Sequence, residues 1–60
     1  MGIKQGSVVI KPQGVMEGVV VRVFHEEFSL MNSDISYYSV LWDDGTSSLE
    51  LSRDIILVER

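Results

Sequence analysis

The residues of this chain that could do chemistry stand next to one another in the sequence. Asp43 and Asp44 are neighbouring carboxylates, a pair that can hold Mg²⁺ or Ca²⁺. His25 precedes Glu26 and Glu27, a trio with the groups for metal binding or acid–base catalysis. Consecutive residues of an extended chain point to opposite sides, however, and Asp-Gly between apolar runs is typical of a tight hairpin turn. We therefore expect the carboxylate pair to form a turn, the trio to lie in a solvated loop, and neither to bind a metal ion.

Other patterns of catalytic chemistry are missing from the sequence. The chain has no cysteine, and its single histidine cannot supply a zinc cluster. No serine stands in the Gly-x-Ser-x-Gly pattern of a nucleophile elbow, and there is no glycine-rich phosphate loop. Ligand pockets commonly occupy about 300–1,000 Å³, which one small chain can hardly enclose. We predict a protein without enzymatic activity and without a cofactor; a catalytic site would have to lie between subunits.

The charge is acidic overall and unevenly distributed. Nine acidic and five basic side chains give a net charge of −4. Residues 1–25 carry three basic side chains against one acidic, a net of +2, whereas residues 26–60 carry eight acidic against two basic, a net of −6. Nucleic-acid binding needs clustered Lys and Arg, so this balance disfavours it. It stays the second hypothesis, and its basic contacts would be Lys4, Lys11, Arg22 and Arg53.

Length and composition predict one small domain that spans residues 1–60. A domain of this size buries only about 60% of the surface of its unfolded chain, so its core is marginal without disulfides, metal or self-association. Hydrophobic residues make up 45% of the chain, which is enough for a compact core. Residues 1–5 lack the apolar segment of a secretory signal, and no run approaches a membrane-spanning helix of about 20 residues. We expect a cytoplasmic protein that does not enter membranes.

Five β-branched or aromatic runs separated by turn residues predict five strands. The expected strands are residues 7–11, 18–24, 37–42, 46–51 and 55–58, and the expected turns are residues 12–14, 43–45 and 52–54, the last a single 3₁₀ turn. Residues 25–34 are compatible with one helical turn or a continued strand, and we expect a hairpin-tip loop there. This arrangement indicates an all-β, five-stranded, partly open barrel of the SH3-like kind.

Alternation along the strands predicts which side chains form the core. The predicted set is Val8, Ile10, Val20, Val23, Tyr38, Val40, Trp42, Leu49, Leu51, Ile55 and Val58. The second and fifth strands are apolar on both faces, although a small barrel covers only one face of each. The other face then exposes an apolar patch of the kind that marks an interface. Together with the small core, this patch predicts a homo-oligomer.

The spacing of these residues resembles that of SH3-like barrels of the Tudor and chromo-barrel type. The similarity covers nearly the whole chain and is carried by Gly6-x-Val8-x-Ile10, Gly18-x-Val20-x-x-Val23, Tyr38-x-Val40-x-Trp42-Asp43-Asp44-Gly45 and Leu51-x-x-x-Ile55. In Tudor-type proteins a cage of aromatic rings binds methylated Lys or Arg. The rings available for one are Phe24, Phe28, Tyr37, Tyr38 and Trp42. The loop of residues 11–18 contributes none, so we expect the rings to pack in the core or to stack along the hairpin.

Two other small barrels are similar over shorter stretches. Lys11-Pro12-x-Gly14 with Gly18-x-Val20 resembles the start of plasmid-type (type II) dihydrofolate reductase, a tetramer with a shared central pore. The Val-Gln-Ile-Tyr run of that enzyme would fall on residues 48–51, where its amide and phenol are absent. Gly6-Ser7-x-Val9-x-x-x-Pro12 resembles the opening of the E-type subunit of photosystem I, which docks electron-transfer partners with basic residues. An oligomeric pore enzyme is therefore the third hypothesis.

The leading hypothesis is a non-enzymatic interaction module that binds protein partners and itself. Residues 25–35 and the rings of Phe28 and Tyr37 are its expected contact surface. Lys11 and Arg22 complete the candidate binding residues, as the basic contacts of the nucleic-acid alternative.

Overall fold

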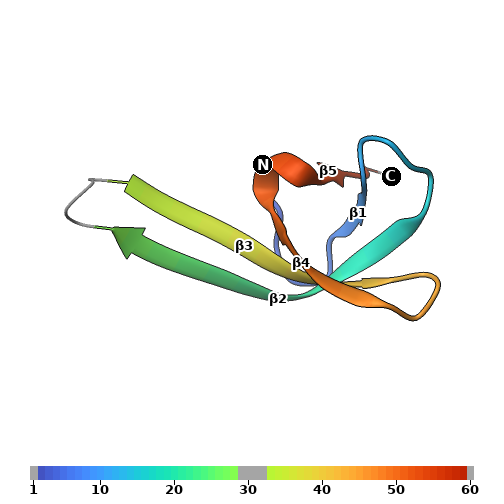
Figure 1. Cartoon of the computed structure of the whole chain (residues 1–60), viewed down its shortest axis with the longest axis horizontal. Coiled ribbons are helices and arrows are strands. Elements are labelled where there is room, and N and C mark those ends of the chain that lie inside the picture. Colours follow the sequence, from blue (N-terminus) through green and yellow to red (C-terminus); the bar gives the residue numbers. More distant parts are fainter. Residues whose placement is uncertain (1, 29–32, 60) are drawn as a thin grey trace.

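Five strands and one 3₁₀ turn make up the computed structural model of this chain. The structure describes residues 2–28 and 33–59, and the side chains of residues 27, 28, 33 and 34 lie outside that description. The elements in chain order are β1 (Val8–Ile10), β2 (Glu17–Phe28), β3 (Ser33–Trp42), β4 (Ser47–Leu51), the 3₁₀ turn η1 (Ser52–Asp54) and β5 (Ile56–Leu57) (Figure 1).

The strands form a single antiparallel sheet in the order β4-β3-β2-β1-β5. Consecutive strands pair with one another from β1 to β4, and the chain then returns through η1 so that β5 pairs with β1. The sheet curls without closing, since β4 and β5 remain at its two ends. The all-β, five-stranded, partly open barrel predicted from the sequence is confirmed, as is the 3₁₀ turn before the last strand.

The core lies between the curled halves of the sheet. Its buried side chains are Val9, Val20, Tyr38, Val40, Trp42 and Ile55. Gly18 supplies the space for the largest of them, because a Cβ at this position would come within 2.6 Å of both Trp42 Cε3 and Val40 Cγ1. Close packing of this kind leaves no room for a methyl group without displacement of the ring.

In two strands, β1 and β4, the predicted core residues are on the wrong face. In β1 the fully buried side chain is Val9, whereas Val8 and Ile10 are half-buried. Three successive β-branched residues carry no alternation, so the sequence could not tell which phase faces inward. In β4 Leu49 is 64% exposed. Ser48 faces the core instead, because its hydroxyl accepts a hydrogen bond from the Trp42 indole N–H.

A further predicted core residue, Val23, is 41% exposed although its cross-strand partner Tyr38 is buried. Val23 is exposed because β2 extends beyond the end of β1, and no strand of the described structure pairs with β2 on that side at this position. Val20, Tyr38, Val40, Trp42 and Ile55 are buried as predicted. The other predicted members, Leu51 and Val58, are half-buried.

The hairpin of β2 and β3 continues well beyond the barrel. Pairing runs on through His25 with Ser36 to Phe28 with Ser33, and the molecule measures 38 × 21 × 21 Å (Figure 1). We call residues 24–28 and 33–37 the arm. The predicted loop over residues 25–34 is therefore wrong outside residues 29–32, which lie beyond the described residues. Burial in the core does not stabilise the arm. Pairs of side chains across its two strands do, on a ribbon that is solvated on both faces.

The predicted Asp-Gly turn is confirmed between β3 and β4. Gly45 has a φ of 88°, a conformation that favours glycine, and its N–H donates to the carbonyl of Trp42 at 2.9 Å. The Asp44 carboxylate accepts hydrogen bonds from the hydroxyl and the backbone N–H of Thr46, at 2.6 and 3.0 Å. These bonds to its charged form lower the pKa of Asp44. The carboxylate is thereby committed to the turn.

Candidate functional site

β2 exposes an unusual amount of apolar surface for so small a chain. Val19, Val21 and Val23 are 41%, 43% and 41% exposed, although Val20 between them is buried. Ile56 of β5 is also exposed. Val19 and Ile56 are thus exposed apolar residues of the second and fifth strands, as predicted, whereas Val23 lies on the other face of β2, beside the buried Tyr38. Exposed apolar residues that gather on one strand are typical of a surface that another chain covers.

The edge of β2 that faces away from β3 is open along residues 21–28. β1 pairs with β2 only as far as Val19, and the Val20 N–H donates to the carbonyl of Ser7 at 2.9 Å. A β-bulge between Val20 and Arg22 then shifts the register with β3. Beyond it, no strand in the described part of the chain pairs with this edge. An open edge presents unpaired N–H and C=O groups that can add a further strand.

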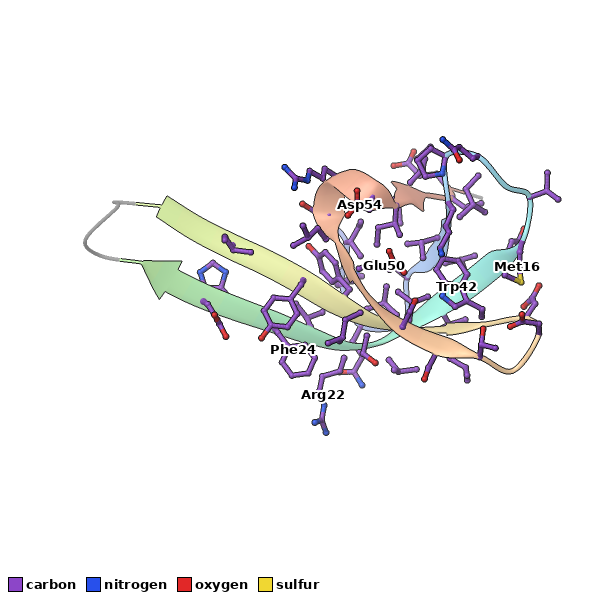
Figure 2. The ribbon with its side chains drawn as sticks, viewed as in Figure 1. Met16, Arg22, Phe24, Trp42, Glu50 and Asp54 are labelled. Carbon is purple, nitrogen blue, oxygen red and sulfur yellow. The ribbon has the colours of Figure 1, made fainter. Side chains whose placement is uncertain are left out.

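The outer face of the β2–β3 hairpin carries a charge of each sign beside stacked aromatic rings. Arg22, Phe24 and Glu26 alternate along β2 and so lie on the same face. The rings of Phe24 and Tyr37 stack with centroids 5.0 Å apart and an interplanar angle of 12°. Figure 2 shows Arg22 and Phe24 on the side of the sheet opposite to Trp42. This face therefore points away from the core.

The Tyr37 hydroxyl donates a hydrogen bond of 3.0 Å to Glu26 Oε1. That bond, with desolvation and the nearby carboxylate charge, raises the pKa of Tyr37. This bond and the stacking on Phe24 hold the Tyr37 side chain in place on the arm, which has no core beneath it. Tyr37 is half-buried by its own neighbours, and its place on the predicted contact surface stays a proposal.

The opposite face of the arm carries His25, whose Nδ1 lies 3.1 Å from Ser36 Oγ. Glu26 lies on the other face, bonded to Tyr37, so these two neighbours do not converge. The side chain of Glu27 is outside the described residues. Across the described residues, no three His, Asp or Glu side chains gather in a way that could hold a metal ion.

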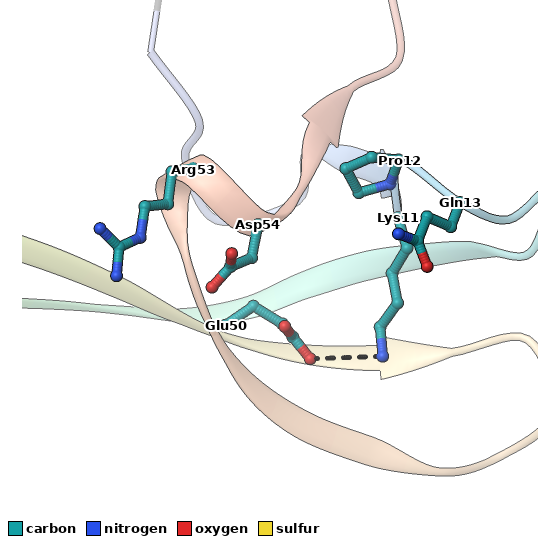
Figure 3. Close-up of a pocket in the computed structure, with 6 residues that line it drawn as sticks. All are labelled: Lys11, Pro12, Gln13, Glu50, Arg53 and Asp54. Carbon is teal, nitrogen blue, oxygen red and sulfur yellow. Dashed lines mark ion pairs between the residues drawn. The ribbon is translucent and has the colours of Figure 1, made fainter.

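A second polar cluster closes one end of the barrel. The Trp42 indole N–H donates to Ser48 Oγ at 2.8 Å, and the Ser48 hydroxyl donates to Glu50 Oε2 at 2.6 Å. The same Glu50 oxygen lies 3.8 Å from Lys11 Nζ (Figure 3), and this nitrogen lies 5.4 Å from the centroid of the Trp42 ring. Each polar group of this cluster therefore has a hydrogen-bond or ion-pair partner within the cluster. Lys11 is held by a carboxylate and an aromatic face of its own chain.

The depression beside this cluster has a volume of about 290 Å³. Its lining residues are Lys11, Pro12, Gln13, Glu50, Arg53 and Asp54 (Figure 3). Two basic and two acidic side chains leave it without a net charge. Of the basic residues named for nucleic-acid binding, Lys11 and Arg53 line this depression, whereas Arg22 lies on the far side of the sheet (Figure 2).

Aromatic rings do not converge on this depression. Trp42 is the ring that Lys11 approaches, whereas Phe24 and Tyr37 stack on the outer face of the arm. The side chain of Phe28 lies outside the described residues. Two features escaped the sequence analysis: the bulge at Val21, for which no local pattern exists, and the inward Ser48 and Glu50. A buried indole N–H needs a hydrogen-bond acceptor, and this requirement could have indicated the inward position of Ser48.

Among the described residues we find no helix long and apolar enough to cross a bilayer. Comparisons with models of known protein families, with curated proteins and with solved structures gave no match.

Proposed function

We propose that this chain is a non-catalytic interaction module that associates with itself and with protein partners. The observation that carries the proposal is the half-exposed apolar surface of β2, where Val19 lies on the outer face and Val21 and Val23 lie along the open edge. Burial of apolar surface stabilises association by about 25 cal/mol per Å². Six buried side chains form the core of the described structure, so contacts with another chain would add substantially to the stability of this one.

The distribution of charge supports a protein partner over a nucleic acid. Lys11 is paired with Glu50 inside its own cluster, and Arg53 lines the same depression as Asp54. Arg22 lies on the other side of the sheet, near Phe24 (Figure 2). Backbone contacts to nucleic acid need basic side chains that follow one surface. Here they are divided between two surfaces and interleaved with carboxylates.

Sedimentation equilibrium over a wide range of protein concentration tests the proposal. We expect the unmodified chain to associate as its concentration rises. The double variant Val21→Thr/Val23→Thr keeps β-branched residues in the strand and should weaken the association about tenfold or more, with little change in the melting temperature of dilute samples in which the chain is monomeric. Val15→Thr is the matched control, because Val15 is 95% exposed and lies outside every strand. A chain that stays monomeric at every concentration would contradict self-association.

Binding of a different protein is the second part of the proposal, with Phe28 and Tyr37 as its contact residues. Tyr37 lies on the arm, away from the core. The double variant Phe28→Ala/Tyr37→Ala should therefore weaken capture of a partner while the melting temperature stays nearly constant. A large fall in melting temperature would mean that these rings stabilise the fold instead.

A further inference from the structure

We propose that two copies of the chain join along their open β2 edges, antiparallel, with Phe24 opposite Phe24 of the second copy. The inference rests on the self-association proposed above and names its contact. The observations behind it are the open edge of residues 21–28 and the order of side chains along it. A strand added to such an edge pairs its backbone groups and lies about 4.8 Å away.

The charges on the outer face of this edge favour one register. Arg22 and Glu26 stand two residues before and two residues after Phe24, on the same face of β2. Antiparallel pairing centred on Phe24 therefore places each Arg22 opposite Glu26 of the other copy. Opposite charges across a strand pair are favourable, and like charges are unfavourable. Registers centred on Arg22 or on Glu26 would instead bring two identical charges together.

The groups involved are free to make these contacts. Arg22 is exposed and makes no ion pair or side-chain hydrogen bond with the described residues. Glu26 uses Oε1 for the Tyr37 hydroxyl, and its second carboxylate oxygen has no bond among those described. The same register sets Val23 beside His25 of the second copy. Val21 and Val23, the exposed valines along this edge, would then gain a neighbouring strand that covers part of their apolar surface.

The other open edges lack this self-complementarity. β4 spans five residues and carries one charge, Glu50, which is already held by Lys11 and Ser48. β5 spans two residues. Pairing of β2 with β2 uses the same edge of both copies, so the interface is symmetric and the assembly closes as a dimer instead of growing into a fibre.

Disulfide trapping tests the register, because the natural chain has no cysteine. In the proposed dimer the two Cβ atoms at position 24 lie about 4.5–5.5 Å apart, close to the separation that a disulfide needs. We expect Phe24→Cys to form a covalent dimer readily in a glutathione redox buffer. His25→Cys is the matched control, since position 25 faces position 23 of the other copy and should form at least about tenfold less dimer at equal concentration.

Charge reversal tests the same register with Phe24 intact. Arg22→Glu alone should weaken the dimer about tenfold, because four carboxylates would then face one another. The double variant Arg22→Glu/Glu26→Arg restores opposite charges in both pairs and should recover the association. Tyr37→Phe keeps the ring and removes only the hydroxyl bonded to Glu26, and so measures how much of any change comes from loss of that bond.

The outcomes separate the two proposals. A dimer in sedimentation that His25→Cys traps as well as Phe24→Cys does, or that charge reversal leaves unchanged, overturns the β2 register while self-association stands. A chain that is monomeric throughout overturns both.

Discussion

The ring of Trp42 lies directly over the backbone of Gly18. A Cβ built on Gly18 would stand 2.6 Å from Trp42 Cε3 and 3.0 Å from Trp42 Cδ2, closer than carbon atoms approach one another. Glycine at this point lets β2 and β3 bring the indole into the core while its N–H reaches Ser48. The sheet can therefore curl around this large side chain, which packs in the core with Tyr38 and four aliphatic residues.

Substitution of Gly18 should be costly. Gly18→Ala forces the Trp42 ring and Val40 apart, and overpacking of this kind destabilises a protein by about 1–3 kcal/mol. Urea unfolding followed by Trp42 fluorescence measures the change. Gly14→Ala is the matched control: its Cβ would meet no atom closer than 4.0 Å, so the free energy of unfolding should change by less than about 0.5 kcal/mol. Equal effects of the two variants would contradict the packing described here.

The bond between Trp42 and Ser48 leads to a second prediction. Ser48→Ala leaves a buried indole N–H without its acceptor and removes a donor to Glu50, which should cost about 1–3 kcal/mol of unfolding free energy. Ser47→Ala, one residue earlier on the exposed side of β4, should change stability by less than about 0.5 kcal/mol. Chemical denaturation of both variants under one set of conditions makes the comparison. A neutral Ser48→Ala would mean that the indole N–H finds another partner.

The hydrogen bond between Tyr37 and Glu26 predicts that the stability of the chain depends on pH in the alkaline range. The neutral Tyr37 phenol donates to Glu26, and this raises its pKa in the folded chain above the ordinary value near 10. The bond therefore contributes stability at every pH below that ordinary value, and the contribution is lost as the pH rises through the raised pKa. Glu26→Ala should bring the pKa of Tyr37 back toward 10. NMR titration of the tyrosine ring signals in dilute samples, assigned with Tyr37→Phe, measures it; an unchanged pKa in Glu26→Ala would contradict the assignment.

The sequence predicted the elements whose patterns are local. Asp44 and Gly45 identify the turn between β3 and β4, and alternation correctly places Val20, Val40 and Trp42 in the core. The arm was missed because its strands are held by cross-strand contacts such as that of Phe24 with Tyr37, which leave no burial pattern along the chain.

The candidate site was predicted only in its composition. The sequence indicated surplus apolar residues on the second strand, and these are the exposed valines of β2. It could not indicate the open edge, because the point where β1 stops pairing with β2 depends on the three-dimensional path of the chain. The pairing of Arg22 with Glu26 of a second copy can be proposed only once both residues are known to lie on that edge.

Sedimentation equilibrium of the unmodified chain, compared with Arg22→Glu and with Arg22→Glu/Glu26→Arg, tests whether two copies of the chain pair along their β2 edges. We expect a concentration-dependent dimer for the unmodified chain, a loss of association of about tenfold in the single variant, and recovery in the double variant. A monomer at all concentrations, or identical association of the three chains, would contradict the dimer proposed along β2.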